Sequence, residues 1–114
     1  MARYNDAELA ENARLRKLFR QEFGQWLRAQ RDAADLTMLE VAKALGFNYY
    51  NDVGIYESGR TALPSTHYVA YSKVLGIDCE EFAQKAVRAF DPIAWDILFG
   101  TGKGIMPVPN VSVK

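Results

Sequence analysis

The chain has 114 residues, of which 49% are hydrophobic and 25% are charged, and its formal net charge is zero. This length and apolar content fit one domain with a single core of modest size. The charge balance excludes a generally basic protein, the usual form in which affinity for nucleic acid is visible from composition. We find no apolar run near 18 residues and no signal-peptide arrangement, which predicts a cytoplasmic protein without a membrane partner.

A long helix is expected at the start of the chain. Asp6 is a suitable N-cap, and apolar residues follow it at helical spacing to about Ala34. The helix is either continuous or jointed near Gly24. Its first half carries apolar side chains that need a covering surface, which is either the chain's own core or a second subunit.

Two short helices separated by a turn are predicted between positions 37 and 59. Thr37 followed by Glu40 is a capping-box pattern, and Gly46 is the residue type that ends a helix in the left-handed conformation. The second helix is expected to open near Asn51-Asp52, which are good N-cap types, and to stop at Gly59. Its exposed front carries asparagines and tyrosines.

Three more helices are expected, followed by a tail. Pro64 opens a helix that Gly76 closes, and Asp78 caps the next one. Asp91-Pro92 opens a short helix that is too apolar to stand in water, so we expect it to be buried in the core or in a dimer interface. From Gly100 onwards the helical period is lost, which predicts a loosely ordered tail.

A family resemblance is carried by Leu45-Gly46-Phe47 and by Val53-Gly54-Ile55-Tyr56-Glu57-Ser58-Gly59-Arg60, which are similar to the lambda-repressor, Cro and XRE-type DNA-binding domain. Phe23–Arg31 upstream and Leu63–Ile77 downstream extend the resemblance. It implies an all-α fold with a five-helix, lambda-repressor-like helix-turn-helix domain at residues 22–90. Residues 1–21 would then be an added N-terminal helical extension, 91–99 a short C-terminal helix and 100–114 a flexible tail.

The resemblance implies a sequence-specific regulator of transcription that binds double-stranded DNA as a homodimer on an inverted repeat and acts as a repressor. Asparagine can pair with adenine in the major groove, and aromatic or aliphatic side chains can pack on thymine methyl groups. The expected base contacts are Asn48, Tyr49, Tyr50, Asn51, Asp52 and Ile55. The expected phosphate contacts are Thr37, Met38, Lys43, Arg60 and Thr61. Candidates for the dimer interface are Leu15, Leu18, Phe19, Trp95, Leu98 and Phe99.

Three features favour a rival interpretation, a protein-interaction module of the same fold, such as an antitoxin or accessory regulator, with weak or no DNA binding. From Asp32 to Thr61 the chain carries five acidic residues and two basic ones. Met38 replaces the glutamine usual in the family, and the segments Leu9–Phe19 and Ile93–Phe99 have a large apolar content. The loop after Phe47 is also about one residue longer than is common in the family, which affects the expected DNA contacts directly. The exposed tyrosines also have an alternative role, which is to fill the core around this longer turn.

Neither an enzyme nor a cofactor or metal site is expected. The run Gly100-Thr101-Gly102-Lys103-Gly104 lacks the spacing and the Ser or Thr after lysine that a phosphate-binding Walker loop needs. The single histidine, His67, and the single cysteine, Cys79, cannot assemble a structural His/Cys metal site. Catalytic residues are therefore predicted to be absent.

Overall fold

The computed structural model describes residues 6–109, and within that range every regular element is a helix. The helices are α1 (Asp6–Ala33), α2 (Met38–Leu45), α3 (Asn51–Ser58), α4 (Tyr68–Leu75), α5 (Cys79–Phe90) and α6 (Pro92–Phe99), with a 3-10 turn, η1 (Ser65–His67), before α4. The prediction of an all-α fold is confirmed for this part of the chain. The expected features at positions 1–5 and 110–114 lie outside the described residues.

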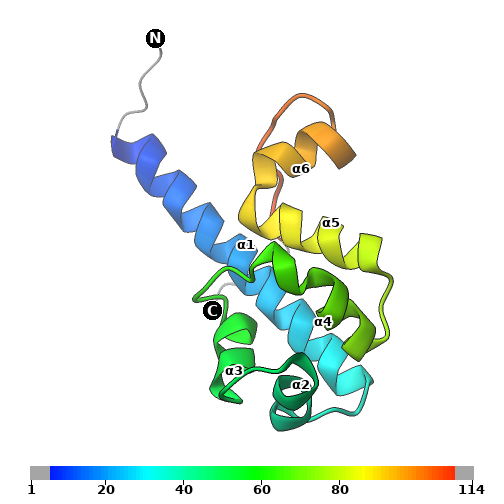
Figure 1. Cartoon of the computed structure of the whole chain (residues 1–114). Helices are drawn as coiled ribbons and strands as arrows, with labels where there is room; N and C mark the ends of the chain where they lie inside the picture. Colours follow the sequence, from blue (N-terminus) through cyan, green and yellow to red (C-terminus); the bar gives the residue numbers. More distant parts are fainter. Residues whose placement is uncertain (1–5, 110–114) are drawn as a thin grey trace.

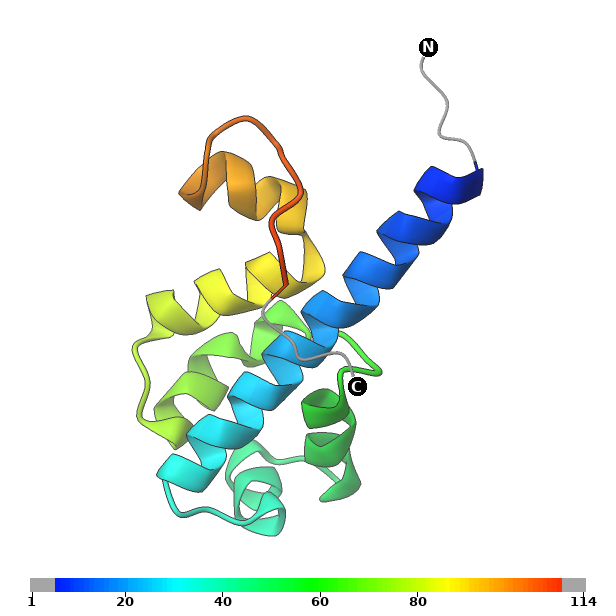
Figure 2. The same ribbon diagram turned by 180° about the vertical axis from the view of Figure 1, so that it is seen from behind.

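Helix α1 is the element against which the rest of the fold is arranged. The other helices gather on its C-terminal half, and its N-terminal half projects beyond them (Figure 1), as the view from behind also shows (Figure 2). Its 28 residues make it the longest element, and they correspond to a length of about 42 Å at 1.5 Å per residue. Within residues 6–109, no helix is both long enough and apolar enough to cross a membrane.

The expected capping signals set most helix boundaries. Thr37 Oγ1 accepts the Glu40 N–H at 3.1 Å, while the Glu40 carboxylate accepts the Thr37 N–H at 3.0 Å. Asp78 and Asp91 cap α5 and α6 through their side chains. Helices α2, α3 and α4 end at glycines with positive φ, namely Gly46, Gly59 and Gly76. These boundaries were predicted correctly because caps depend on near neighbours in the chain.

The start of α3 differs from the prediction by one residue. Asn51 is the first helical residue, and the cap position before it is occupied by Tyr50, whose side chain makes no capping hydrogen bond. Asn51 therefore keeps its side chain free of a capping role.

Helix α1 is continuous through Gly24, and the reason for glycine there is close packing. A Cβ on Gly24 would collide with the backbone carbonyl of Glu57 in α3. Gly59, at φ 78°, approaches α1 in the same way, since a Cβ there would lie 2.8 Å from the Arg20 carbonyl. The two glycines let the backbones of α1 and α3 touch, which side chains would prevent.

An aromatic cluster forms the centre of the core between α1, α4 and α5. The Phe23 ring lies 5.3 Å from Phe90 and 5.9 Å from Phe82, with edge-to-face geometry in both pairs. Such pairs add about 0.5 to 1.5 kcal/mol each beyond the burial of their surface. Phe19 is also completely buried, below the guanidinium of Arg88. Phe19 was expected at a dimer interface, but its side chain belongs to the interior of this chain.

Helix α6 is not buried in the core, so one of the two expected places for it is wrong. Its exposed side chains are Ile97 (53%), Leu98 (66%) and Phe99 (46%), whereas Pro92 and Asp96 are its buried residues. The helix packs on α5 with one face and presents the rest outward. The dimer-interface alternative is compatible with this exposure.

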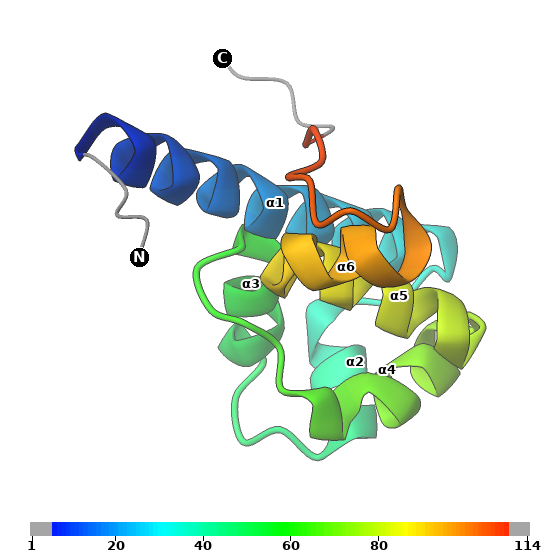
Figure 3. The same cartoon turned by 90° about the horizontal axis from the view of Figure 1, so that it is seen from above.

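Asp96 orders the segment that follows α6. Its carboxylate accepts the Thr101 hydroxyl at 2.6 Å, the Thr101 N–H at 3.1 Å and the Ile105 N–H at 2.8 Å. These hydrogen bonds, first that from the Thr101 side chain, lower the pKa of Asp96. The chain then returns toward α1 (Figure 3), where Arg88 donates to the Val108 carbonyl at 2.7 Å. The first part of the expected flexible tail is therefore held by specific contacts.

Candidate nucleic-acid interface

Helix α3 combines a fixed back with an exposed front. Val53 is completely buried and faces the core. The exposed front is formed by the turn that precedes α3 and by the first residue of the helix: Tyr49 is 70% exposed and Tyr50 is 52% exposed, and Asn48 and Asn51 are exposed too. The tyrosines therefore do not fill the core around the turn. Of the other expected base contacts, Asp52 and Ile55 are partly buried.

Phe47 organises the turn between α2 and α3. Its N–H donates to the Ala42 carbonyl at 2.9 Å, beyond the left-handed Gly46. Its ring contacts Tyr56 and His67, with centroid distances of 6.0 and 5.2 Å. The turn is thus anchored at its start, and positions 48–50 remain on the surface.

A charged pair joins α3 to α1. Arg31 donates from Nε and Nη2 to the two carboxylate oxygens of Glu57, and from Nη1 to the Leu36 carbonyl at 2.9 Å. Only 13% of the Arg31 side chain and 7% of the Glu57 side chain are exposed. Hydrogen bonding to Glu57 raises the pKa of Arg31. Bidentate pairs of this kind fix geometry as well as adding energy, so α3 has a defined orientation.

The N-terminus of α2 is less suited to phosphate than the sequence suggested. The Thr37 N–H was expected to contact phosphate, but it donates to the Glu40 carboxylate, which also places a negative charge there. The hydrogen bonds from Thr37, first that from its backbone, lower the pKa of Glu40. Met38 packs against the core, and its sulfur lies beside Gly54 of α3. Of the expected contacts at this helix end, only the Met38 N–H is left outside the capping box.

The remaining expected phosphate contacts lie on the surface. Lys43, in the last turn of α2, and Arg60 and Thr61, just after α3, are all exposed. Arg60 is steadied by Ser58, whose hydroxyl oxygen accepts from the Arg60 N–H and from its Nε. These three side chains are available to an anion.

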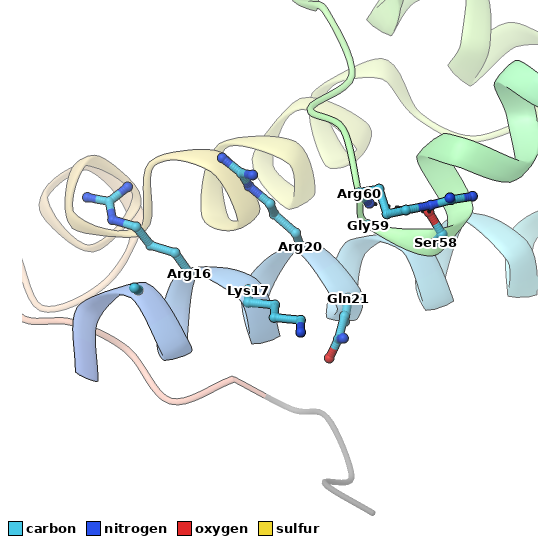
Figure 4. A pocket seen from close by; sticks show the side chains of 8 residues that line it. Arg16, Lys17, Arg20, Gln21, Ser58, Gly59 and Arg60 are labelled. Atoms are coloured by element: carbon cyan, nitrogen blue, oxygen red, sulfur yellow. Dashed lines mark hydrogen bonds between the residues drawn. The ribbon is translucent and has the colours of Figure 1, made fainter. Parts of the chain in front are cut away.

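A basic hollow lies where the end of α3 meets α1. It has a volume of about 430 Å³, and its lining contains four cationic side chains and no carboxylate; the lining residues are Ala13, Arg16, Lys17, Arg20, Gln21, Ser58, Gly59 and Arg60. Arg16 and Arg20 lie one helical turn apart and point to the same side of α1, while Arg60, which follows α3, extends alongside Ser58 and away from Arg20 (Figure 4). The spacing of Arg16 and Arg20 was visible in the sequence. The presence of Arg60 in the same lining was not, because it depends on the α1–α3 contact.

Comparison of the chain with protein-family models, curated proteins and solved structures gave no match. The family resemblance of the sequence stays a prediction. Residues 6–109 contain no group of three or more His, Cys, Asp or Glu placed to hold a metal ion. The glycine-rich run after α6 folds around the Asp96 carboxylate, so its N–H groups at positions 101 and 105 already have an anionic partner.

The candidates for a dimer interface are divided between two surfaces. Leu15 and Leu18 are partly buried on the projecting half of α1, and Leu98 and Phe99 are exposed on α6. Trp95 is partly buried, and the Arg88 guanidinium lies 4.7 Å from its ring centre. Helix α6 therefore offers the most accessible apolar side chains of this set.

Proposed function

We propose that the chain is a sequence-specific, double-stranded DNA-binding regulator of transcription in which α2 and α3 form a helix-turn-helix of the lambda-repressor type. One observation carries the proposal, namely that α3 has a rigidly held back and a solvent-exposed polar front. Val53, the Gly24 contact and the Arg31–Glu57 pair hold the back. A helix that contacts base edges needs such support, because hydrogen bonds to the bases depend on fixed geometry.

The exposed side chains suggest which bases would be read. Asn48 and Asn51 suit adenine, because an asparagine amide can form a bidentate pair with the base edge: its NH2 group donates to N7 and its oxygen accepts from the N6 amino group. Tyr49 and Tyr50 can pack on thymine methyl groups. The front of α3 has no arginine for guanine. We therefore expect a half-site that contains A·T pairs.

The local charges make base contacts important for affinity. Glu40 at the start of α2 and Asp52 in the first turn of α3 add negative charge to the surface that would face DNA. Phosphates are repelled by such groups, so nonspecific binding should be weak. Specific binding would then need two copies of the chain, with half-sites one helical turn apart, about 34 Å, and repression would follow when the occupied site blocks a promoter.

The test is selection of bound duplexes from a random double-stranded library by the full-length protein at moderate salt. A two-fold symmetric motif with A·T pairs in each half is the expected result. The Asn51→Ala protein should lose about 1 to 3 kcal/mol of binding on that motif and little on scrambled duplexes. Recovery of no motif would overturn the proposal.

A second candidate function is supported by the exposed apolar face of α6. Ile97, Leu98 and Phe99 form a surface that a protein partner would cover, which fits an antitoxin or accessory regulator of the same fold. Salt dependence separates the two functions. A fall in duplex affinity with increasing salt marks phosphate contacts, and no detectable duplex binding at low salt favours the protein partner.

A further inference from the structure

The basic hollow between α1 and the end of α3 has no role in reading bases. Its cations come from two places far apart in the sequence: Arg16, Lys17 and Arg20 lie on α1, and Arg60 follows α3. All four side chains are exposed. The hollow therefore belongs to the surface and is open to a large ligand.

The positive charge of the hollow is not neutralised by the chain itself. Among residues 6–109, Arg16, Lys17 and Arg20 take part in no ion pair, whereas Arg14 on the same helix pairs with Glu11. Four like charges around one hollow repel each other, and an anion with several negative groups would relieve that repulsion.

We propose that this hollow binds backbone phosphates of the duplex on the outer flank of the bases that α3 reads. The inference rests on the proposed DNA-binding function. Ser58, Gly59 and Arg60 line the hollow, so it begins at the C-terminal end of α3. From Gly24 to Arg16, α1 extends about 12 Å, so Arg16 lies beyond the contact between Gly24 and α3. Exposed arginines and a lysine suit sugar-phosphate backbone, which fixes register without reading sequence.

The geometry favours duplex phosphates over a small enclosed anion. The lining supplies long, exposed side chains, and the only hydroxyl in it, from Ser58, is already bonded to Arg60 and to the Ile55 carbonyl. A pocket for a small ligand instead has a few fixed polar groups in an enclosed, mostly apolar wall.

The experiment uses the full-length protein and its selected duplex, with affinity measured by fluorescence anisotropy between 50 and 200 mM salt. The test variant is Arg16→Gln/Lys17→Gln/Arg20→Gln. The control variant, Arg28→Gln/Lys73→Gln/Lys103→Gln, removes the same charge from exposed sites outside the hollow. Circular dichroism establishes that both variants are folded.

The expected result is a specific change in the test variant. Its salt slope should fall by about 2 to 3, because each phosphate contact contributes about 0.9, and its preference for the selected sequence over a scrambled one should stay the same. Neutral methylphosphonates on the outer flank of the duplex should weaken its binding by the wild-type protein and by the control variant, but not by the test variant.

Three results would overturn the inference. If the test and control variants have equal salt slopes while the wild type binds its motif, the hollow is not a phosphate site and the proposed function stands. If inorganic phosphate raises the melting temperature of the wild type but not the test variant, and duplex binding is equal in both, the hollow binds a small anion. If the wild type binds no duplex, the proposed function and this inference fail together.

Discussion

Arg31 and Glu57 are 26 positions apart in the chain, and their side chains meet through two hydrogen bonds of 2.7 and 3.0 Å between α1 and α3. The same arginine also holds the Leu36 carbonyl in the connection to α2. One side chain thus links α1, the connection that leads to α2, and α3. This pair stands next to the Gly24 contact, so α3 is held on α1 by charge and by close backbone packing together.

Removal of the carboxylate should destabilise the fold. In Glu57→Ala, the guanidinium of Arg31 would lose its carboxylate partner in a nearly buried place, which should lower the free energy of unfolding by about 2 to 3 kcal/mol. Urea denaturation measures this change. Glu11→Ala is the matched control, because it breaks the exposed pair with Arg14 and should have little effect. Equal losses in the two variants would show that the α1–α3 pair contributes nothing special.

The α1–α3 contact should not tolerate a side chain on α1. Gly24→Ala places a methyl group against the Glu57 carbonyl, so α3 must move. We expect a loss of about 1 to 3 kcal/mol in unfolding free energy, as for other overpacked sites, and weaker duplex binding.

Gly54→Ala provides the comparison within α3. A methyl group there would lie 3.6 Å from the Met38 sulfur, an ordinary contact. This variant should be neutral or more stable by up to about 1 kcal/mol, because alanine favours a helix. Thermal melts of both proteins test the pair of expectations, and a stable Gly24→Ala protein would contradict the packing argument.

Tyr71 should be replaceable by phenylalanine. The ring is 1% exposed, and within the described residues its hydroxyl has no hydrogen-bond partner. Burial, and then the nearby Glu57 charge, raise the pKa of Tyr71. Tyr71→Phe should therefore keep or increase the unfolding free energy, by up to about 1 kcal/mol.

Tyr71 should also lower the free energy of unfolding of the wild-type protein at alkaline pH. Above about pH 10, an unfolded tyrosine loses its proton, whereas folded Tyr71 retains it, so unfolding free energy falls as pH rises. Chemical denaturation at several alkaline pH values should show a smaller fall in Tyr71→Phe. Parallel curves for the two proteins would contradict the assignment.

Acid should release the segment after α6. Because hydrogen bonds from Thr101 and Ile105 lower the pKa of Asp96, its contribution is present above about pH 3.9, the unfolded value, and is lost as pH falls through the folded pKa. The protection factor of the Ile105 amide, which compares its exchange rate with the intrinsic rate at the same pH, should fall in acid. Asp96→Asn should show fast exchange already at neutral pH, and Thr101→Val an intermediate rate. Unchanged protection in Asp96→Asn would argue against this anchor.

Charge on α6 should disrupt self-association if α6 is the homodimer interface. Leu98→Asp would place a carboxylate on the exposed apolar face, and sedimentation equilibrium should report a weaker dimer. Val69→Asp is a matched control, since Val69 is 52% exposed on α4. If both variants keep the oligomeric state of the wild type, the subunits associate elsewhere.

Local signals were readable from the sequence, and long-range contacts were not. The capping box at Thr37 and the glycine at position 46 depend on neighbours within four residues, so their roles were predicted correctly. Gly24 was ambiguous because glycine in a helix serves either a joint or a close approach, and only α3 decides between them. The burial of Phe19 likewise depends on Arg88, on a helix distant in sequence.

The candidate nucleic-acid interface was also predictable only where it depends on residues close together in the sequence. The exposed asparagines and tyrosines of the turn were identified from their order in the chain, whereas the N–H of Thr37, expected to contact phosphate, already has a partner within the chain. The Glu40 carboxylate that occupies its N–H was already visible as half of the capping box. The basic hollow was missed because α1 and Arg60 are brought together only by the fold.

Because α1 is continuous, it fixes the position of its basic side chains relative to α3. Arg16 and Arg20 share one unbroken helix with Gly24, so the number of intervening residues sets both their distance from α3 and their angle around the helix axis. One residue inserted between positions 21 and 23 would advance the basic side chains by about 1.5 Å and turn them by about 100°. A change of length in that stretch would therefore rotate the arginines away from the end of α3, even if every side chain kept its chemical type.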